Sequence, residues 1–252
     1  MKLKFIGLLF ILLSLVFCAS TQKKIEKARM KDPQYQYNMG LFHLNRNNPD
    51  EAIRYFNSAL ALNPRYDLAL NALGLAYSMK GNFEEAVRQY QNCININPAL
   101  TEVHNNLGTA YQEMGLIDKA EQEFRVAISD VNYRSKELPY YNLARLYLEQ
   151  GKVEEALSYI ERSIEINKSF RMGYNLRGNI LERLSRYEEA IESYKTALKN
   201  LEGDVDISFN LAVAYFKNNE LSKAKEIFEK IYPRVSDLEI KKKIDEYLRM
   251  IK

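Results

Sequence analysis

Residues 67–100 read DLALNALGLAYSMKGNFEEAVRQYQNCININPAL, and this stretch decides the fold. Between Leu70 and Tyr77, apolar residues recur at the spacing of one face of an α-helix, which predicts an amphipathic helix in the first half. Gly81 and Asn82 follow this helix, and they combine a helix stop with a residue that caps the next helix. The stretch therefore predicts two helices joined by a tight turn.

The same pattern returns six times along the chain. An alanine marks each copy, with spacings of 34, 34, 36, 34 and 34 residues: Ala52, Ala86, Ala120, Ala156, Ala190 and Ala224. A small residue stands twelve positions before each alanine: Gly40, Gly74, Gly108, Ala144, Gly178 and Ala212. A bulky apolar residue stands four positions after it: Phe56, Tyr90, Phe124, Ile160, Tyr194 and Phe228. The small residue lets the second helix approach the first closely, and stacking buries the apolar faces that a single pair leaves exposed.

These residues resemble the tetratricopeptide repeat over about residues 33–236. The resemblance implies an all-α fold, a right-handed superhelical solenoid in which the first helix of each pair lines a concave groove. The predicted repeats are 33–66, 67–100, 101–134, 137–170, 171–204 and 205–236. Apolar residues recur among the lysines of 237–252, which predicts a C-terminal capping helix.

The first 20 residues have the pattern of an export signal. Two lysines precede the apolar stretch Phe5–Phe17, which at 13 residues is shorter than the roughly 20 residues of a membrane-spanning helix. The letters LVFCAS at 15–20 resemble a bacterial lipoprotein box, which implies a lipid on Cys18. Residues 21–32 are predicted to be a polar tether.

Phe17 leaves the processing of this segment open, because a lipoprotein box usually has a small residue before its cysteine. Lipidation of Cys18 would place the protein on the periplasmic face of the outer membrane, since Ala19 is not the acidic residue that retains lipoproteins at the inner membrane. Cleavage after Ser20 would instead leave a soluble periplasmic protein, and an uncleaved segment would itself be an anchor. Cys18 and Cys93 do not make a disulfide framework.

The sequence contains no pattern that indicates catalysis. His43 and His104 lack partners at metal-ligand spacing, and the chain has neither a P-loop nor a glycine-rich dinucleotide turn. Paired glutamates such as Glu84 and Glu85 begin the second helices, where acidic residues favour the helix N-terminus. Without the two signal lysines, 34 basic residues face 33 acidic ones, which argues against nucleic-acid binding. We therefore expect no enzyme activity, metal, cofactor, nucleic acid or small-molecule substrate.

The repeat resemblance also implies where a partner binds, because helix positions 2, 5, 6, 9, 12 and 13 of the first helices tend to face the groove in that family. In the first four repeats the candidate groove residues are Tyr37, Asn38, Leu41, Leu44, Leu68, Asn71, Leu75, Met79, Asn105, Asn106 and Asn142. In the last two repeats such positions hold Asn175, Asn179, Glu182, Arg183, Phe209, Asn210, Val213 and Phe216.

Two features of these positions bear on what the groove holds. Each repeat has an asparagine on or near the groove, and amides pair with both the N–H and the C=O of an extended peptide; asparagine is also common there in the repeat itself. The first two repeats are apolar, which suits an amphipathic helix or an apolar tail of a partner. Partial burial against residues 21–33 or the next helix is the alternative, and the sequence leaves strand or helix binding open.

The overall layout resembles the type IV pilus biogenesis and stability lipoproteins, which are pilotins of the pilus secretin. The local likeness lies in DVNY at 130–133, followed by PYYNL at 139–143. The resemblance implies a carrier that binds unassembled secretin subunits through its first repeats, takes them to the outer membrane by its lipid, and promotes ring assembly. The alternative is a general periplasmic scaffold for another envelope or secretion complex.

Overall fold

A computed structural model describes residues 28–199 and 203–251, so the predicted signal peptide with Cys18 lies outside the described residues. The chain divides into two compact units that meet in sequence between Leu116 and Ile117. Within the described ranges all regular structure is helical and no strand occurs. The all-α prediction is therefore confirmed.

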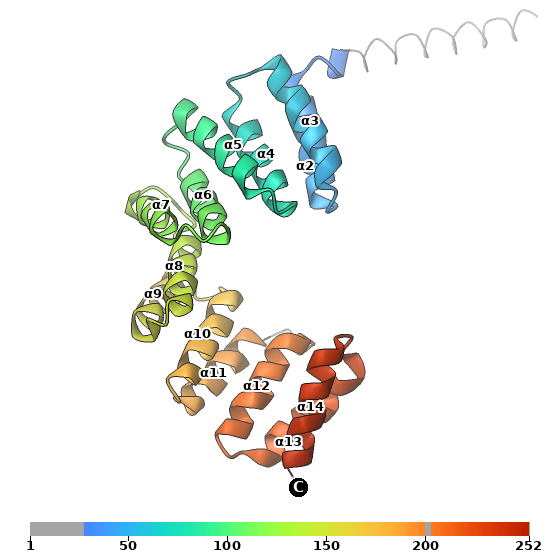
Figure 1. The fold of residues 1–252 in the computed structure, drawn as a ribbon, viewed down its shortest axis with the longest axis vertical. Coiled ribbons are helices and arrows are strands. Elements are labelled where there is room, and N and C mark those ends of the chain that lie inside the picture. Colours follow the sequence, from blue (N-terminus) through green and yellow to red (C-terminus); the bar gives the residue numbers. More distant parts are fainter. Residues whose placement is uncertain (1–27, 200–202, 252) are drawn as a thin grey trace, which may run out of the picture. The chain divides into compact units, whose positions relative to one another are not determined.

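The N-terminal unit consists of helices that pair along the chain (Figure 1). They are α2 (Pro33–Asn45), α3 (Pro49–Leu62), α4 (Asp67–Met79), α5 (Phe83–Ile96) and α6 (Glu102–Glu113). Helix α2 packs against α3, and α4 packs against α5. Helix α4 also contacts α2 and α6, so the first helices of successive pairs stand next to one another and form one wall.

The C-terminal unit continues the same arrangement. Its helices are α7 (Ile117–Ser129), α8 (Glu137–Glu149), α9 (Val153–Ile166), α10 (Arg171–Arg183), α11 (Tyr187–Ala197), α12 (Val205–Lys217), α13 (Leu221–Ile231), a 3-10 turn (Tyr232–Arg234) and α14 (Leu238–Met250). Helices α8, α10 and α12 contact one another in sequence order, and α9, α11 and α13 pack behind them as their partners. We call α2, α4, α6, α8, α10 and α12 the A helices, and α3, α5, α7, α9, α11 and α13 the B helices.

The turns inside the pairs explain where the helices stop. Gly81 has a φ of +72°, a left-handed conformation that glycine adopts without strain and that ends α4. The next residue, Asn82, caps α5, because its Oδ1 accepts a hydrogen bond from the backbone N–H of Glu85 at 3.3 Å. Asn48 caps α3 in the same way through the N–H of Glu51. The Gly-Asn signal in the sequence thus sets the tight turn between helices.

At two of the joints between paired helices, an aromatic ring packs so closely on a glycine that no side chain fits there. A Cβ added to Gly74 would lie 2.4 Å from Cε1 of Tyr90, because that ring packs directly on the backbone of α4. Gly178 meets Tyr194 at the same distance. Tyr90 and Tyr194 are both buried. The Gly–aromatic spacing of the sequence is therefore a contact between helices, and it recurs in both units.

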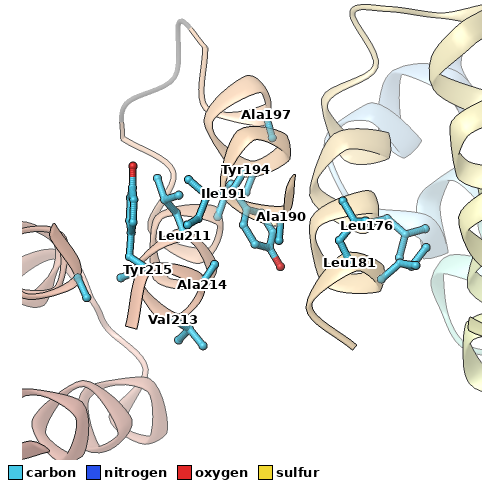
Figure 2. Packing of buried hydrophobic residues seen from close by; sticks show 14 of the residues in the cluster. Leu176, Leu181, Ala190, Ile191, Tyr194, Ala197, Leu211, Val213, Ala214 and Tyr215 are labelled. Carbon is cyan, nitrogen blue, oxygen red and sulfur yellow. The ribbon is translucent and has the colours of Figure 1, made fainter. Parts of the chain in front are cut away.

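The core of the C-terminal unit runs continuously through its helix pairs. Figure 2 shows part of it, with buried side chains that come from α10, α11 and α12. The labelled members are Leu176, Leu181, Ala190, Ile191, Tyr194, Ala197, Leu211, Val213, Ala214 and Tyr215. Each pair thus buries its apolar face against the next, as expected for a solenoid.

Helix α14 closes the C-terminal end. Its Tyr247 ring lies 4.9 Å from the Phe216 ring and stacks on the Phe228 ring at 5.2 Å, so it contacts both helices of the last pair. Ile244 of the same helix is completely buried. These contacts cover the apolar surface that a further repeat would otherwise cover, which confirms the predicted capping helix.

Candidate functional site

The predicted groove residues of the first two repeats lie on the A helices α2 and α4. Leu68, Asn71, Leu75 and Met79 follow one another at helical spacing on a single face of α4. On α2 the corresponding residues are Tyr37, Leu41 and Leu44. Since α2 and α4 contact each other, we name these seven residues together the N-terminal wall.

The N-terminal wall is apolar and partly open. Leu41 and Leu44 are half-buried, because they pack against the core formed by α3 and α4. Leu68 is 38% exposed and Met79 is 47% exposed, while Leu75 is intermediate. The wall therefore offers apolar side chains that a partner would cover, and burial of such surface is favourable by about 25 cal/mol per Å².

Tyr37 joins this wall to the start of α4. Its ring lies 5.3 Å from the ring of Tyr66, whose hydroxyl donates a 2.7 Å hydrogen bond to Oε1 of Gln34. Gln34 in turn donates to Oδ1 of Asn38 at 3.0 Å. Burial raises the pKa of Tyr37, and the nearby Tyr66 and the carboxylate of Glu102 raise it further. Tyr37 is accordingly a neutral, well-supported part of the wall.

The asparagines serve the protein itself more than the sequence indicated. Asn71 is only 6% exposed, and its Nδ2 donates to Oε1 of Glu102 at 2.7 Å. Its Oδ1 accepts from Nδ2 of Asn106 on the next A helix at 3.0 Å. Asn105 and Asn142 are buried as well. The expected ladder of free amides for a peptide backbone is thus replaced, at Asn71, by a bridge between neighbouring repeats.

The structure adds a cavity that joins groove positions of the last two repeats to residues of the capping helix. A cavity of about 470 Å³ opens between α8, α10, α12 and α14 in the C-terminal unit. We call it the C-terminal pocket, and its lining residues are Leu148, Asn179, Glu182, Arg183, Phe209, Asn210, Val213, Lys217, Lys243 and Tyr247. Several of these stand at groove positions of the repeat, but Lys243 and Tyr247 come from the capping helix, which the repeat pattern does not cover.

The remaining reactive residue types have structural roles. Cys93 is completely buried, and its Sγ lies 3.2 Å from the backbone oxygen of Asp67. Burial raises the pKa of this thiol to about 11, and the charge of Asp67 adds to the shift, so the nucleophilic thiolate is disfavoured. Across residues 28–199 and 203–251, no cluster of three or more His, Cys, Asp or Glu side chains is arranged to hold a metal ion. Nor does any helix in these ranges have the length and apolar character to cross a bilayer.

Comparison with known proteins identifies the repeats. Family models of the tetratricopeptide repeat match residues 37–92 and 79–115, and a model of the tetratricopeptide repeat protein 21 C-terminal ARM domain matches residues 132–246. The chain is a tetratricopeptide-repeat protein. Proteins of this kind are generally non-enzymatic scaffolds that bind protein partners.

Sequence relatives match only parts of this tetratricopeptide-repeat chain. A TPR repeat-containing protein of Methanocaldococcus jannaschii is 36% identical over 104 residues, which is 41% of this chain and 17% of that protein. Human tetratricopeptide repeat protein 21A is 30% identical over 102 residues, or 38% of this chain and 8% of that protein. The chain therefore spans a small fraction of the length of these relatives.

Solved structures resemble the tetratricopeptide fold over most of this chain. Pseudomonas aeruginosa PilF superposes with a TM-score of 0.74 at 18% identity, covering 87% of this chain and 99% of PilF. PilW, a widely conserved type IV pilus biogenesis factor, gives 0.76 at 15% identity and covers 84% and 97% of the two chains. YrrB, a TPR protein with an unusual peptide-binding site, gives 0.56 at 18% identity, covering 76% and 97%. At these identities the likeness establishes the fold.

Proposed function

We propose that this protein is a type IV pilus pilotin, whose N-terminal wall binds an apolar segment of the outer-membrane secretin subunit. The observation that carries the proposal is the wall itself, where Leu68 and Met79 stay exposed next to half-buried Leu41 and Leu75. An amphipathic partner would cover this surface with its own apolar face. Such an apolar wall can bind a partner rather than catalyse a reaction.

The structural likeness to PilF and PilW supports the pilus assignment. The superposition covers those chains almost completely, at 99% of PilF and 97% of PilW. In the proposal, the protein receives secretin subunits in the periplasm and promotes their assembly. A general envelope scaffold would use the same wall for a different partner.

The proposal places the protein at the outer membrane through Cys18. Several acyl chains on this cysteine would anchor it firmly, since each buried CH₂ contributes about 0.8 kcal/mol. Incorporation of radiolabelled palmitate should be lost in Cys18→Ala. Continued labelling of that variant would exclude lipidation at Cys18.

The wall is tested by placing a charge on it. Leu68→Asp should weaken capture of the secretin subunit about tenfold or more, because a partner would bury a carboxylate without a counter-ion. Capture of the purified secretin subunit by the purified protein, at a series of concentrations, measures this effect. Leu68 is 38% exposed, so the substitution leaves the core intact.

Leu62→Asp is the control for this experiment. Leu62 is 44% exposed on the B helix α3, away from the wall, so the same change of residue type should leave capture unaltered. Equal capture by Leu68→Asp and the unchanged protein would refute the wall as the binding surface. Normal secretin multimers in cells that lack this protein would reject the pilotin role and favour another envelope scaffold.

A further inference from the structure

Part of the C-terminal pocket lining is polar and is held in place by hydrogen bonds and an ion pair. Glu182 has a side chain only 11% exposed, and its Oε2 accepts a 2.7 Å ion-pair bond from Nζ of Lys217. Its Oε1 lies 2.7 Å from the hydroxyl of the buried Tyr194, which donates toward it. Glu182 is thereby held in place and its charge is already matched. The carboxylate that the pocket contains is therefore not available to a ligand.

Two cations of the pocket have no such match. Lys243 on α14 makes no hydrogen bond or ion pair with any part of the chain that the structure describes. Arg183 donates to the backbone oxygen of Leu148 at 3.2 Å, which satisfies one N–H group and leaves its positive charge without a carboxylate. The pocket lining contains three cationic side chains and one anionic side chain. An anionic ligand would complete this arrangement.

The pocket lining also contains apolar and aromatic side chains. Phe209 and Tyr247 have rings 6.4 Å apart, and Leu148 and Val213 lie beside them in the lining. Asn210, which also lines the pocket, donates its Nδ2 to Oδ1 of Asn175 at 3.3 Å, and its own Oδ1 is a further acceptor. A ligand that fits must carry an apolar group within a few bonds of an acidic group.

We propose that the C-terminal pocket is a second binding site, which takes an extended acidic segment of a protein partner with an apolar residue next to an Asp or Glu. The carboxylate lies against Lys243 and Arg183, the apolar side chain lies against Phe209 and Tyr247, and the amide of Asn210 bonds the segment's backbone. A volume of about 470 Å³ lies within the range of about 300–1,000 Å³ that is usual for binding pockets.

The two surfaces select different ligands. The N-terminal wall lies near Glu102, which bonds Asn71, so a carboxylate is disfavoured there. The C-terminal pocket has the opposite charge and is lined by residues of the C-terminal unit alone. An acidic segment should therefore bind the pocket and leave the wall free.

A tryptophan-containing peptide gives a direct assay, because the chain has no tryptophan of its own. The probe is acetyl-Gly-Asp-Glu-Trp-Leu-Glu-Gly-amide, and its emission is followed as the full chain is added at 50 mM salt. Saturable binding with a blue shift is expected. Lys243→Glu should weaken it about tenfold, and 300 mM salt should weaken binding to the unchanged protein.

Lys242→Glu is the matched control, because it makes the same charge change at an exposed neighbour on α14 that does not line the pocket. It should bind within about twofold of the unchanged protein. A second probe with Asn and Gln in place of Asp and Glu should bind at least tenfold more weakly. Circular dichroism of both lysine variants checks that the helices are intact.

The proposal would be overturned by absence of saturable binding to the unchanged protein, by equal binding of the amide probe, or by equal weakening by Lys242→Glu and Lys243→Glu. Leu68→Asp separates the two proposed sites. It should leave binding of the acidic probe unchanged, and loss of that binding would move the acidic ligand to the N-terminal wall and refute the pocket.

Discussion

Helix pairs α4–α5 and α10–α11 occupy equivalent places in the repeat, and their joints are nearly the same. The Gly74–Tyr90 contact of the first pair corresponds to the Gly178–Tyr194 contact of the second, with the same 2.4 Å approach to an added Cβ. Both rings are fully buried. The joint between the helices is therefore independent of the unit in which the pair stands.

The groove faces of the same two A helices differ at two positions near their C-terminal ends. Leu75 and Met79 of α4 correspond to Asn179 and Arg183 of α10. Positions that are apolar on α4 are thus polar or charged on α10, where they line the C-terminal pocket. The Gly–Tyr joint beneath them is the same in both pairs. Residues of the joint specify the scaffold, whereas the wall positions are free to specify the ligand.

The two tyrosines also differ in what their hydroxyl groups hold. The hydroxyl of Tyr90 lies 3.3 Å from Oγ of Ser78, a long contact between neutral groups. The equivalent of Ser78 is Glu182, and the hydroxyl of Tyr194 lies 2.7 Å from its carboxylate. A short hydrogen bond to a carboxylate therefore joins the polar wall of the C-terminal pocket to the buried tyrosine, whereas the equivalent contact in the N-terminal unit is long and neutral.

The largest expected effect comes from breaking the joint in either unit. Gly74→Ala and Gly178→Ala should each lower the free energy of unfolding by about 3 kcal/mol, because the new methyl group forces a buried ring and its helix apart. Urea unfolding followed by circular dichroism measures both. Similar losses are expected in the two units, since the joints have the same geometry.

Ala144→Gly supplies the reverse change in the fourth repeat, where the equivalent pair is Ala144 and Ile160. Here the cost should be only about 1 kcal/mol, the usual penalty for glycine inside a helix. A loss below 1 kcal/mol for Gly74→Ala, or a clear difference between Gly74→Ala and Gly178→Ala, would contradict the view that both units share one joint.

The second expected effect is a loss of stability in alkali. Burial raises the pKa of Tyr90 to about 12, against an ordinary value of 10.0. The folded state holds this proton more tightly than the unfolded state, so the stabilisation is complete below pH 10 and is lost as the pH rises through 12. The loss that Tyr90 causes should reach about 2 kcal/mol at pH 12.

Tyr90→Phe isolates this contribution from the other groups that titrate in alkali. Between pH 8 and pH 12, the free energy of unfolding should fall by about 2 kcal/mol less in Tyr90→Phe than in the unchanged protein. Parallel losses in the two proteins would show that the hydroxyl of Tyr90 reaches solvent in the folded state.

The sequence predicts the joints between paired helices better than it predicts the contacts of the groove walls. The Gly–aromatic spacing, the Gly81 turn and the proline and asparagine helix ends are local signals, and they predict the helix pairs because each acts within one repeat. The bond between Asn71 and Glu102 joins two repeats, so the groove positions alone leave it unseen. The sequence marks Asn71 as a groove residue but carries no sign that its amide is already used.

The C-terminal pocket shows the same limit more strongly. Asn179, Glu182 and Arg183 stand at groove positions, and sequence analysis identifies them as polar members of the fifth repeat. Lys243 enters the pocket only because Tyr247 packs among the rings of the last pair and fixes how α14 lies. The amphipathic pattern of 237–252 predicts a capping helix and gives no information about its rotation relative to α12.

The smallest expected effect tests whether the tyrosine hydroxyls differ between the units at neutral pH. Tyr194→Phe should cost about 1–2 kcal/mol, because it removes the donor to Glu182, a carboxylate that is largely buried. Tyr90→Phe should cost only about 0.5 kcal/mol, since the contact to Ser78 is long and neutral. Urea unfolding at pH 7 gives both losses of stability, and we expect them to differ by about 1 kcal/mol.

The same variant also tests what positions Glu182 in the pocket. Because Lys217 also holds Glu182, Tyr194→Phe should leave the pocket formed. A loss of acidic-peptide binding much beyond tenfold would mean that the hydroxyl, rather than the ion pair, positions this wall. Equal losses of stability in Tyr194→Phe and Tyr90→Phe would contradict the view that the tyrosine hydroxyl supports the wall more strongly in the C-terminal unit than in the N-terminal unit.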